Sequence, residues 1–194
     1  GKKKIRKGAM MGVLEVWHPD IEEFITAKQT PGRLTKFNTS VGVTDAFMKA
    51  VEDNQKWDLI FPDIDVDKGK YNTEWEGDIK KWIAEDGKVK IYKTVKAREL
   101  YKLITESTYN RNEPGILFID TINKMNNLTV IEHINATNPC GEEPLPNGGA
   151  CLLGAINATQ FINDDYTDWN YNTLEKAVAN TVKFLDSVIE ITHL

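Results

Sequence analysis

The chain has 194 residues, of which 41% are hydrophobic and 27% charged, and its formal net charge is −5. These values are typical of one globular domain, or of one large piece of a domain. The negative charge argues against bulk nucleic-acid binding, and no apolar run approaches the roughly 18 residues of a membrane span. Two cysteines are too few for a secreted disulfide scaffold, so a reducing, cytoplasmic setting is predicted.

Apolar periodicity and turn residues divide most of the chain into strands and helices. The first helix, for example, follows Pro19 and Asp20 and places Ile21, Phe24 and Ile25 at helical spacing. The expected elements in chain order are a strand at 9–17, a helix at 21–28, a strand at 37–43, a helix at 45–54, a strand at 57–62, a helix at 97–110, a strand at 116–120, a strand at 150–159 and a helix at 173–192. The last helix carries an apolar stripe of Leu174, Val178, Val182, Leu185 and Ile189.

Residues 63–96 are interpreted as a surface insertion. This stretch is polar, contains several Asp, Gly and Lys residues, and is interrupted by Trp75 and Trp82. Its segment KVKIYKTV is expected to form a hairpin after Asp86-Gly87.

The order of the remaining elements predicts an α/β fold with buried parallel strands. About five strands are expected, and no finishing strand follows the last helix. The chain is therefore expected to be an internal fragment of a larger domain.

Both cysteines lie in the segment NATNPCGEEPLPNGGACLLG. Ten residues separate Cys140 from Cys151, and no second cysteine pair is present, so the spacing does not favour a zinc site and no metal is predicted. Spacing alone leaves open a disulfide or two buried free thiols.

The neighbours of Cys140 suggest a catalytic alternative. Asn138, Cys140 and Glu142 alternate, so an extended backbone would place all three side chains on one face. A carboxylate can accept a proton, an amide can orient a hydroxyl group, and sulfur can carry redox or radical chemistry.

Five stretches together resemble the catalytic subunit of ribonucleotide reductase, most closely its adenosylcobalamin-dependent class. They occur in the family's order and are RKGAMMGVLEVWHPDIEEFITAK, FNTSVGVTDAFMKAV, EPGILFIDTIN, NATNPCGEEPL and ACLLGAIN. Some class I enzymes, which take their radical from a separate di-metal subunit, share the N-P-C-G-E core. Residues 63–96 have no confident match in the family.

The resemblance implies a fold and a set of roles. The fold is a ten-stranded α/β barrel, of which this chain would supply about one half-barrel, a finger loop at 133–143 and the next strand. Cys140 matches the thiyl-radical cysteine that abstracts the 3′ hydrogen of the ribose. Glu142 matches the carboxylate that accepts the 3′-hydroxyl proton, Asn138 the amide that binds the ribose, and Cys151 one of the two reducing cysteines.

The resemblance also implies partners. These are a ribonucleotide substrate, a nucleotide effector, adenosylcobalamin or a di-metal subunit, a thioredoxin-like dithiol reductant and the rest of the reductase chain. Arg6 and Lys7 match the end of a loop between the effector site and the substrate base, although composition alone reads the basic run 2–7 as a solvated tail. The competing interpretation is a catalytically incompetent fragment that acts as a binding or assembly module.

Overall fold

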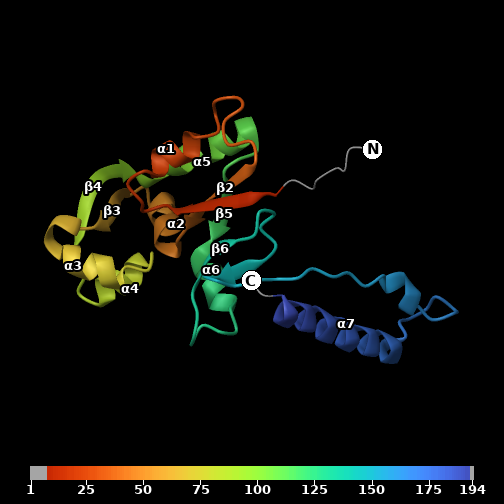
Figure 1. Cartoon of the computed structure of the whole chain (residues 1–194). Helices are drawn as coiled ribbons and strands as arrows, with labels where there is room; N and C mark the ends of the chain where they lie inside the picture. The colour runs from red at the N-terminus through yellow and green to blue at the C-terminus, as the bar shows by residue number, and fades with distance from the viewer. Residues whose placement is uncertain (1–7, 193–194) are drawn as a thin grey trace, which may run out of the picture. The chain divides into compact units, whose positions relative to one another are not determined.

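The computed structural model describes residues 8–192 of the chain (Figure 1). These residues form two compact units that divide between Asn147 and Gly148 and are described separately. Arg6 and Lys7 lie outside the described residues. Within the described range, no helix combines the length and the apolar character needed to cross a membrane.

The first unit is built on a three-stranded parallel sheet. Its strands are β1 (Met10–Glu15), β2 (Phe37–Val43) and β5 (Gly115–Phe118), in the order β1-β2-β5. Val13 pairs with Ser40, and Ser40 with Gly115. The predicted α/β class with parallel strands is confirmed, but of the three strands only β2 contains buried residues. Three strands pair here rather than about five, and the described residues form no closed barrel.

Three predicted helices cover this sheet and are confirmed. They are α1 (Ile21–Thr26), α2 (Asp45–Glu52) and α5 (Ala97–Arg111), and α5 packs against both α1 and α2. Thr44 caps α2, because its side chain accepts a hydrogen bond from the Phe47 backbone N–H at 3.1 Å. The shared core consists of Val16, Ile21, Ile25, Val41, Val43, Phe47, Ala50, Leu59, Ala97, Leu100 and Ile104.

The stretch 63–96 is more regular than the sequence indicated. It forms α3 (Ile64–Glu74), α4 (Ile79–Ala84) and β4 (Val89–Lys96). The segment KVKIYKTV is a strand as expected, but the predicted hairpin after Asp86-Gly87 is wrong, because β4 pairs antiparallel with β3 (Lys56–Pro62).

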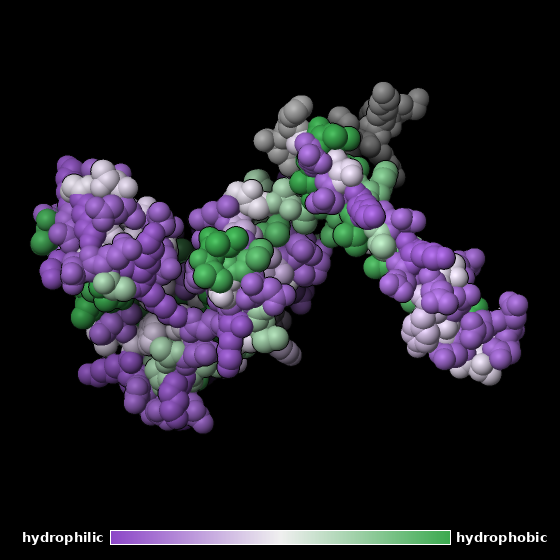
Figure 2. All heavy atoms as spheres, turned by 90° about the horizontal axis from the view of Figure 1, so that it is seen from below, coloured by the Kyte–Doolittle hydropathy of each residue, from purple (hydrophilic) through white to green (hydrophobic). Residues whose placement is uncertain are grey.

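A small aromatic core explains why these helices form. Ile79 and Trp82 of α4 are buried together with Trp17, and Tyr71 and Trp75 pack against them. Polar residues occupy the outer faces of these helices. Figure 2 shows mostly hydrophilic side chains on the left of the molecule, where Figure 1 places α3 and α4. The polar composition therefore reflects two helices of which only α4 buries residues, Ile79 and Trp82. The status of 63–96 as an insertion within the family stays a prediction.

A short antiparallel hairpin follows the sheet. After α6 (Ile119–Met125), β6 (Ile134–Thr137) pairs with β7 (Pro144–Pro146). We refer to residues 134–146 as the β6–β7 hairpin. It contains most of the predicted finger loop at 133–143.

The second unit contains the long helix α7 (Tyr171–Ile191), which confirms the last predicted helix. The strand predicted at 150–159 is wrong: residues 150–157 have no regular structure, and Ala158–Phe161 is a short 3-10 helix. A strand needs a neighbour for its backbone hydrogen bonds. In the described part of this unit the only strand-like pairing is one bridge between Ile162 and Trp169.

We expect Phe47→Ala to lower the free energy of unfolding by about 3–5 kcal/mol, because it leaves a cavity in the main core. Phe47 is fully buried and its ring meets Trp57 edge to face, with centroids 5.2 Å apart. Urea unfolding measures the change. Tyr109→Ala is the matched control, since Tyr109 lies on α5 and is 89% exposed. Equal losses for the two variants would contradict the assigned core.

Candidate active site

The predicted residues Asn138, Cys140 and Glu142 lie together in the turn of the β6–β7 hairpin. The turn is closed by its own backbone: the Asn138 N–H donates to the Glu143 carbonyl at 3.2 Å, and the Gly141 N–H donates to the Asn138 carbonyl at 3.0 Å. The Asn138 side-chain oxygen accepts from the Glu143 N–H at 3.0 Å. Asn138 thus stabilises the turn and keeps its amide NH2 group for another partner.

The expected extended backbone at these residues is wrong. Gly141 has a φ of +84°, in the region that favours glycine, and the chain reverses direction there. The alternation rule therefore does not apply, and sequence proximity within one tight turn gathers the three residues instead. Cys140 is an exposed free thiol and Glu142 is also exposed, so both side chains can meet a ligand from outside this unit.

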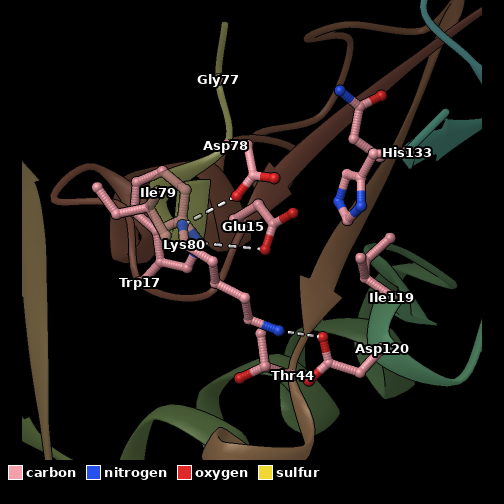
Figure 3. Close-up of a pocket in the computed structure, with 11 residues that line it drawn as sticks. Glu15, Trp17, Thr44, Gly77, Asp78, Ile79, Lys80, Ile119, Asp120 and His133 are labelled. Atoms are coloured by element: carbon pink, nitrogen blue, oxygen red, sulfur yellow. Dashed lines mark hydrogen bonds and ion pairs between the residues drawn. The ribbon is translucent and has the colours of Figure 1, made fainter. Parts of the chain in front are cut away.

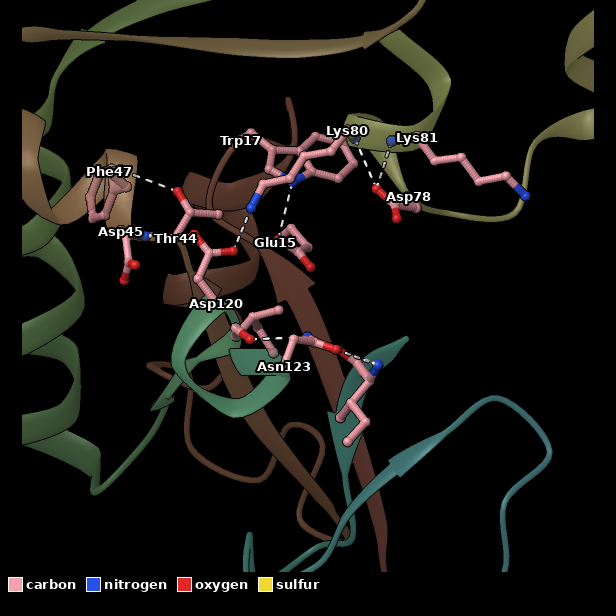
Figure 4. A network of polar contacts seen from close by, with 12 residues as sticks. Glu15, Trp17, Thr44, Asp45, Phe47, Asp78, Lys80, Lys81, Asp120 and Asn123 are labelled. Atoms are coloured by element: carbon pink, nitrogen blue, oxygen red, sulfur yellow. Dashed lines mark hydrogen bonds and ion pairs between the residues drawn. The ribbon is translucent and has the colours of Figure 1, made fainter. Parts of the chain in front are cut away.

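The base of the hairpin is fixed by Asn123 of α6. Its side-chain NH2 donates to the Ile134 carbonyl at 2.7 Å, and its side-chain oxygen accepts from the Ile134 N–H at 2.9 Å. The same NH2 also donates to the Ile119 carbonyl at 3.0 Å within α6. Figure 4 shows Asn123 bridging the helix and the hairpin strand. A single amide therefore satisfies both backbone groups of Ile134.

A polar pocket lies beside this base, at the carboxyl ends of the parallel strands (Figure 3). Glu15 is the last residue of β1, Thr44 follows β2, and Asp120 follows β5. The carboxyl ends of parallel strands meet at one edge of a sheet, where α/β proteins commonly bind ligands. The other polar residues that line the pocket are Asp78, Lys80, His133 and Asn135.

The charges in this pocket depend on one another. Burial raises the pKa of Glu15 to about 7, although a hydrogen bond from the Trp17 indole N–H at 3.1 Å and the charge of Lys80 both favour the carboxylate. Burial would also raise the pKa of Asp120, but hydrogen bonds from Lys80 and from the Asp45 backbone N–H outweigh burial and lower it. Glu15 can therefore exchange a proton near neutral pH, whereas Asp120 stays ionised.

The remaining predicted site residues are Cys151, Arg6 and Lys7. Cys151 lies in the second unit as an exposed free thiol, and neither cysteine forms a disulfide. Arg6 and Lys7 fall outside residues 8–192. Within that range, no group of three or more His, Cys, Asp and Glu side chains is arranged to hold a metal ion.

Sequence reasoning missed Asn123 and the pocket residues. The position of polar residues directly after buried strands was the available signal for Glu15, Thr44 and Asp120. Lys80 gave no such signal, because it reaches the pocket from α4, whose position depends on the aromatic core.

Comparisons with known proteins agree with the motif in the turn. A family model described as "Ribonucleotide reductase, barrel domain" matches residues 2–194. The chain is 39% identical over 189 residues to the vitamin B12-dependent ribonucleoside-diphosphate reductase of Mycobacterium tuberculosis (strain ATCC 25618 / H37Rv), covering 97% of this chain and 23% of that protein.

Two further relatives give the same picture. The enzyme of the same name from Thermoplasma acidophilum is 35% identical over 186 residues, which cover 95% of this chain and 21% of the relative. The ribonucleoside-diphosphate reductase subunit alpha of Chlamydia pneumoniae is 30% identical over 198 residues, with 96% and 19% covered. The chain thus spans less than a quarter of the length of these relatives.

We expect Glu15→Gln to raise the free energy of unfolding at pH 8 by about 2–3 kcal/mol and to change it little at pH 4.5. The carboxyl pKa is raised from 4.5 to about 7 in the folded protein, so the folded state binds the proton more tightly and stability falls as pH rises through this window. Glutamine does not titrate, so the free energy of unfolding of the variant does not fall in this way as pH rises.

Urea unfolding across this pH range measures the effect. Lys80, Asp78, Asp120 and His133 face the same pocket and remain in both proteins. Glu106→Gln, at an exposed position of α5, is the control and should show no such trend. A Glu15→Gln effect of equal size at both pH values would contradict the raised pKa.

Proposed function

Because the chain belongs to the ribonucleotide reductase barrel-domain family, we propose that its protein reduces ribonucleotides to deoxyribonucleotides for DNA synthesis, with Cys140 as the radical thiol. The observation that carries the proposal is the Asn138–Cys140–Glu142 turn, which combines an exposed thiol with a neighbouring carboxylate and amide. The proposal applies to the protein expressed from the whole natural reading frame.

The proposed chemistry begins with a hydrogen atom transfer at the ribose. The C3′–H bond breaks and an S–H bond forms at Cys140, so the unpaired electron passes from sulfur to carbon. Glu142 takes the proton of the 3′-hydroxyl group, and the Asn138 NH2 group binds a ribose hydroxyl. At the end of the cycle Cys140 returns the hydrogen atom to C3′.

The net reaction consumes two electrons. The 2′-hydroxyl group leaves as water, and two thiols supply the electrons and become a disulfide. Cys151 is proposed as one of these thiols. The chain contains only two cysteines, so the second reducing thiol comes from outside these 194 residues. A thioredoxin-like dithiol then restores the pair by thiol–disulfide exchange, which requires a reducing compartment such as the cytoplasm.

The radical source is proposed to be adenosylcobalamin, as the names of the Mycobacterium and Thermoplasma relatives suggest for those proteins. When bound, this cofactor supplies a radical able to remove the hydrogen atom of a thiol. The exposed Cys140 thiol fits that chemistry, and no described residue is assigned to the corrin ring. The alternative source is a separate di-metal subunit.

The rest of the enzyme is proposed to complete a ten-stranded barrel around the β6–β7 hairpin. The three parallel strands would form part of its wall. No residue of α7 is buried, and its apolar stripe includes Val178 and Val182, which are 43% and 58% exposed. Such a stripe is expected to pack against other parts of the barrel. Arg6 and Lys7 remain proposed contacts for substrate or a nucleotide effector.

We expect Cys140→Ala to abolish product formation, because no other side chain in the turn can carry the radical. The assay supplies ribonucleoside diphosphate or triphosphate, a dithiol and adenosylcobalamin, and it quantifies deoxyribonucleotide by chromatography. Glu106→Gln is the control and should retain full activity. If product appears only with a di-metal subunit, that subunit replaces adenosylcobalamin as the proposed radical source. An active Cys140→Ala variant would overturn the proposed role of the thiol.

A further inference from the structure

The turn that carries Cys140 is attached to the parallel sheet by one side chain. Asn38 of β2 is half-buried, and its NH2 group donates a hydrogen bond to the Pro139 carbonyl oxygen with an N–O distance of 2.6 Å. The two residues are 101 positions apart in the chain. This contact is therefore tertiary and is independent of the turn's own hydrogen bonds.

The accepting carbonyl lies directly before the thiol residue. The Pro139 carbonyl group and the Cys140 nitrogen belong to one planar peptide unit, so a bond that fixes the carbonyl also fixes the Cys140 backbone. The ring of Pro139 restricts its own φ on one side. On the other side, the Gly141 N–H is bound to the Asn138 carbonyl. Asn38 thus fixes one of the two peptide planes that flank the Cα of Cys140 and together set the direction of its Cα–Cβ bond; the Gly141 N–H belongs to the other.

Asn38 is itself held by a rigid support. β2 is the central strand of the sheet, with Asn38 in register with Met11 of β1. The Lys28 ammonium group donates to the Phe37 carbonyl at 2.6 Å, and the Thr39 N–H donates to the Glu113 carboxylate at 3.2 Å. Lys28 and Glu113 form an ion pair with each other. The backbone on both sides of Asn38 is therefore bound to the same pair of charges.

We infer that Asn38 is a positioning residue that directs the Cys140 thiol toward the ribose C3′ through its hydrogen bond to Pro139. This inference rests on the proposed function. It assigns Asn38 no contact with substrate. Hydrogen atom transfer requires the sulfur and the C3′–H bond to be close and aligned, so a small rotation of the Cys140 backbone slows that step while substrate binding is preserved.

The test compares Asn38→Ala and Asn38→Asp with wild type in the protein expressed from its whole natural reading frame. Both variants remove the donor, and aspartate keeps the side-chain shape. Asn126→Ala is the matched control, because Asn126 is also a half-buried amide but bonds Glu132 and Leu128 instead of the turn. Steady-state rates are measured with ordinary and 3′-deuterated ribonucleotide.

We expect kcat to fall about 10- to 100-fold in both Asn38 variants, with KM changed less than about twofold. The 3′-deuterium isotope effect on kcat should rise above that of wild type, because hydrogen transfer becomes the slow step. Asn126→Ala should match wild type in all three quantities. Wild-type kcat in the Asn38 variants, or a loss of kcat without a larger isotope effect, would overturn the inference.

A second measurement does not depend on activity. Amide hydrogen exchange in the 194-residue chain should show about tenfold faster exchange at Asn138 and Gly141 in Asn38→Ala. Exchange in β1 and β5 should stay as in wild type, and unchanged exchange in the turn would overturn the proposed attachment. A wild-type protein without reductase activity, or an active Cys140→Ala variant, would instead overturn the proposed function.

Discussion

Two asparagine side chains bind the β6–β7 hairpin to the rest of its unit, one near its base and one at its turn. Asn123 binds both backbone groups of Ile134 at the base, and Asn38 binds the Pro139 carbonyl next to the thiol. The turn contains Pro139 and the left-handed Gly141, and it buries little apolar surface of its own. Without these amides, the position of Cys140 would depend on the packing of β6 against β1 and α6 and on a short two-stranded pairing, which is marginal in water.

The parallel sheet is the platform for both attachments. Asn38 lies in the first part of β2, whereas Glu15 and Thr44 mark the carboxyl ends of β1 and β2 and line a pocket with Asn135 of the hairpin. The hairpin therefore runs along the sheet from its carboxyl edge toward its amino edge. This course separates the pocket at the hairpin base, with its titrating carboxyl group, from the exposed thiol in the turn.

The sequence alone predicted the sheet and its helices well, because these elements have strong local signals. Apolar periodicity located α5, and Thr44 followed by an amphipathic segment located α2. The stretch 63–96 was harder, because α3 and α4 depend on an aromatic cluster that also includes Trp17 from a distant segment. The segment 150–159 looked like a strand because it is apolar, but a strand also requires a paired neighbour.

The candidate site was predicted by residue type and missed in geometry. The N-P-C-G-E motif identified Cys140, yet its backbone is a turn and not an extended strand. Nothing near Asn38 in the sequence points to Pro139, because tertiary contacts across 101 residues have no local pattern. Such positioning residues become visible only when the fold brings two segments together.

A crystal structure of the complete protein with a bound ribonucleotide would test the central claim most directly. We expect the Cys140 sulfur to lie about 3–4 Å from the ribose C3′, a distance suited to reaction, with Glu142 near the 3′-hydroxyl group and the Pro139 carbonyl still bound by Asn38. A ribonucleotide held away from this turn, with another side chain against C3′, would contradict the account.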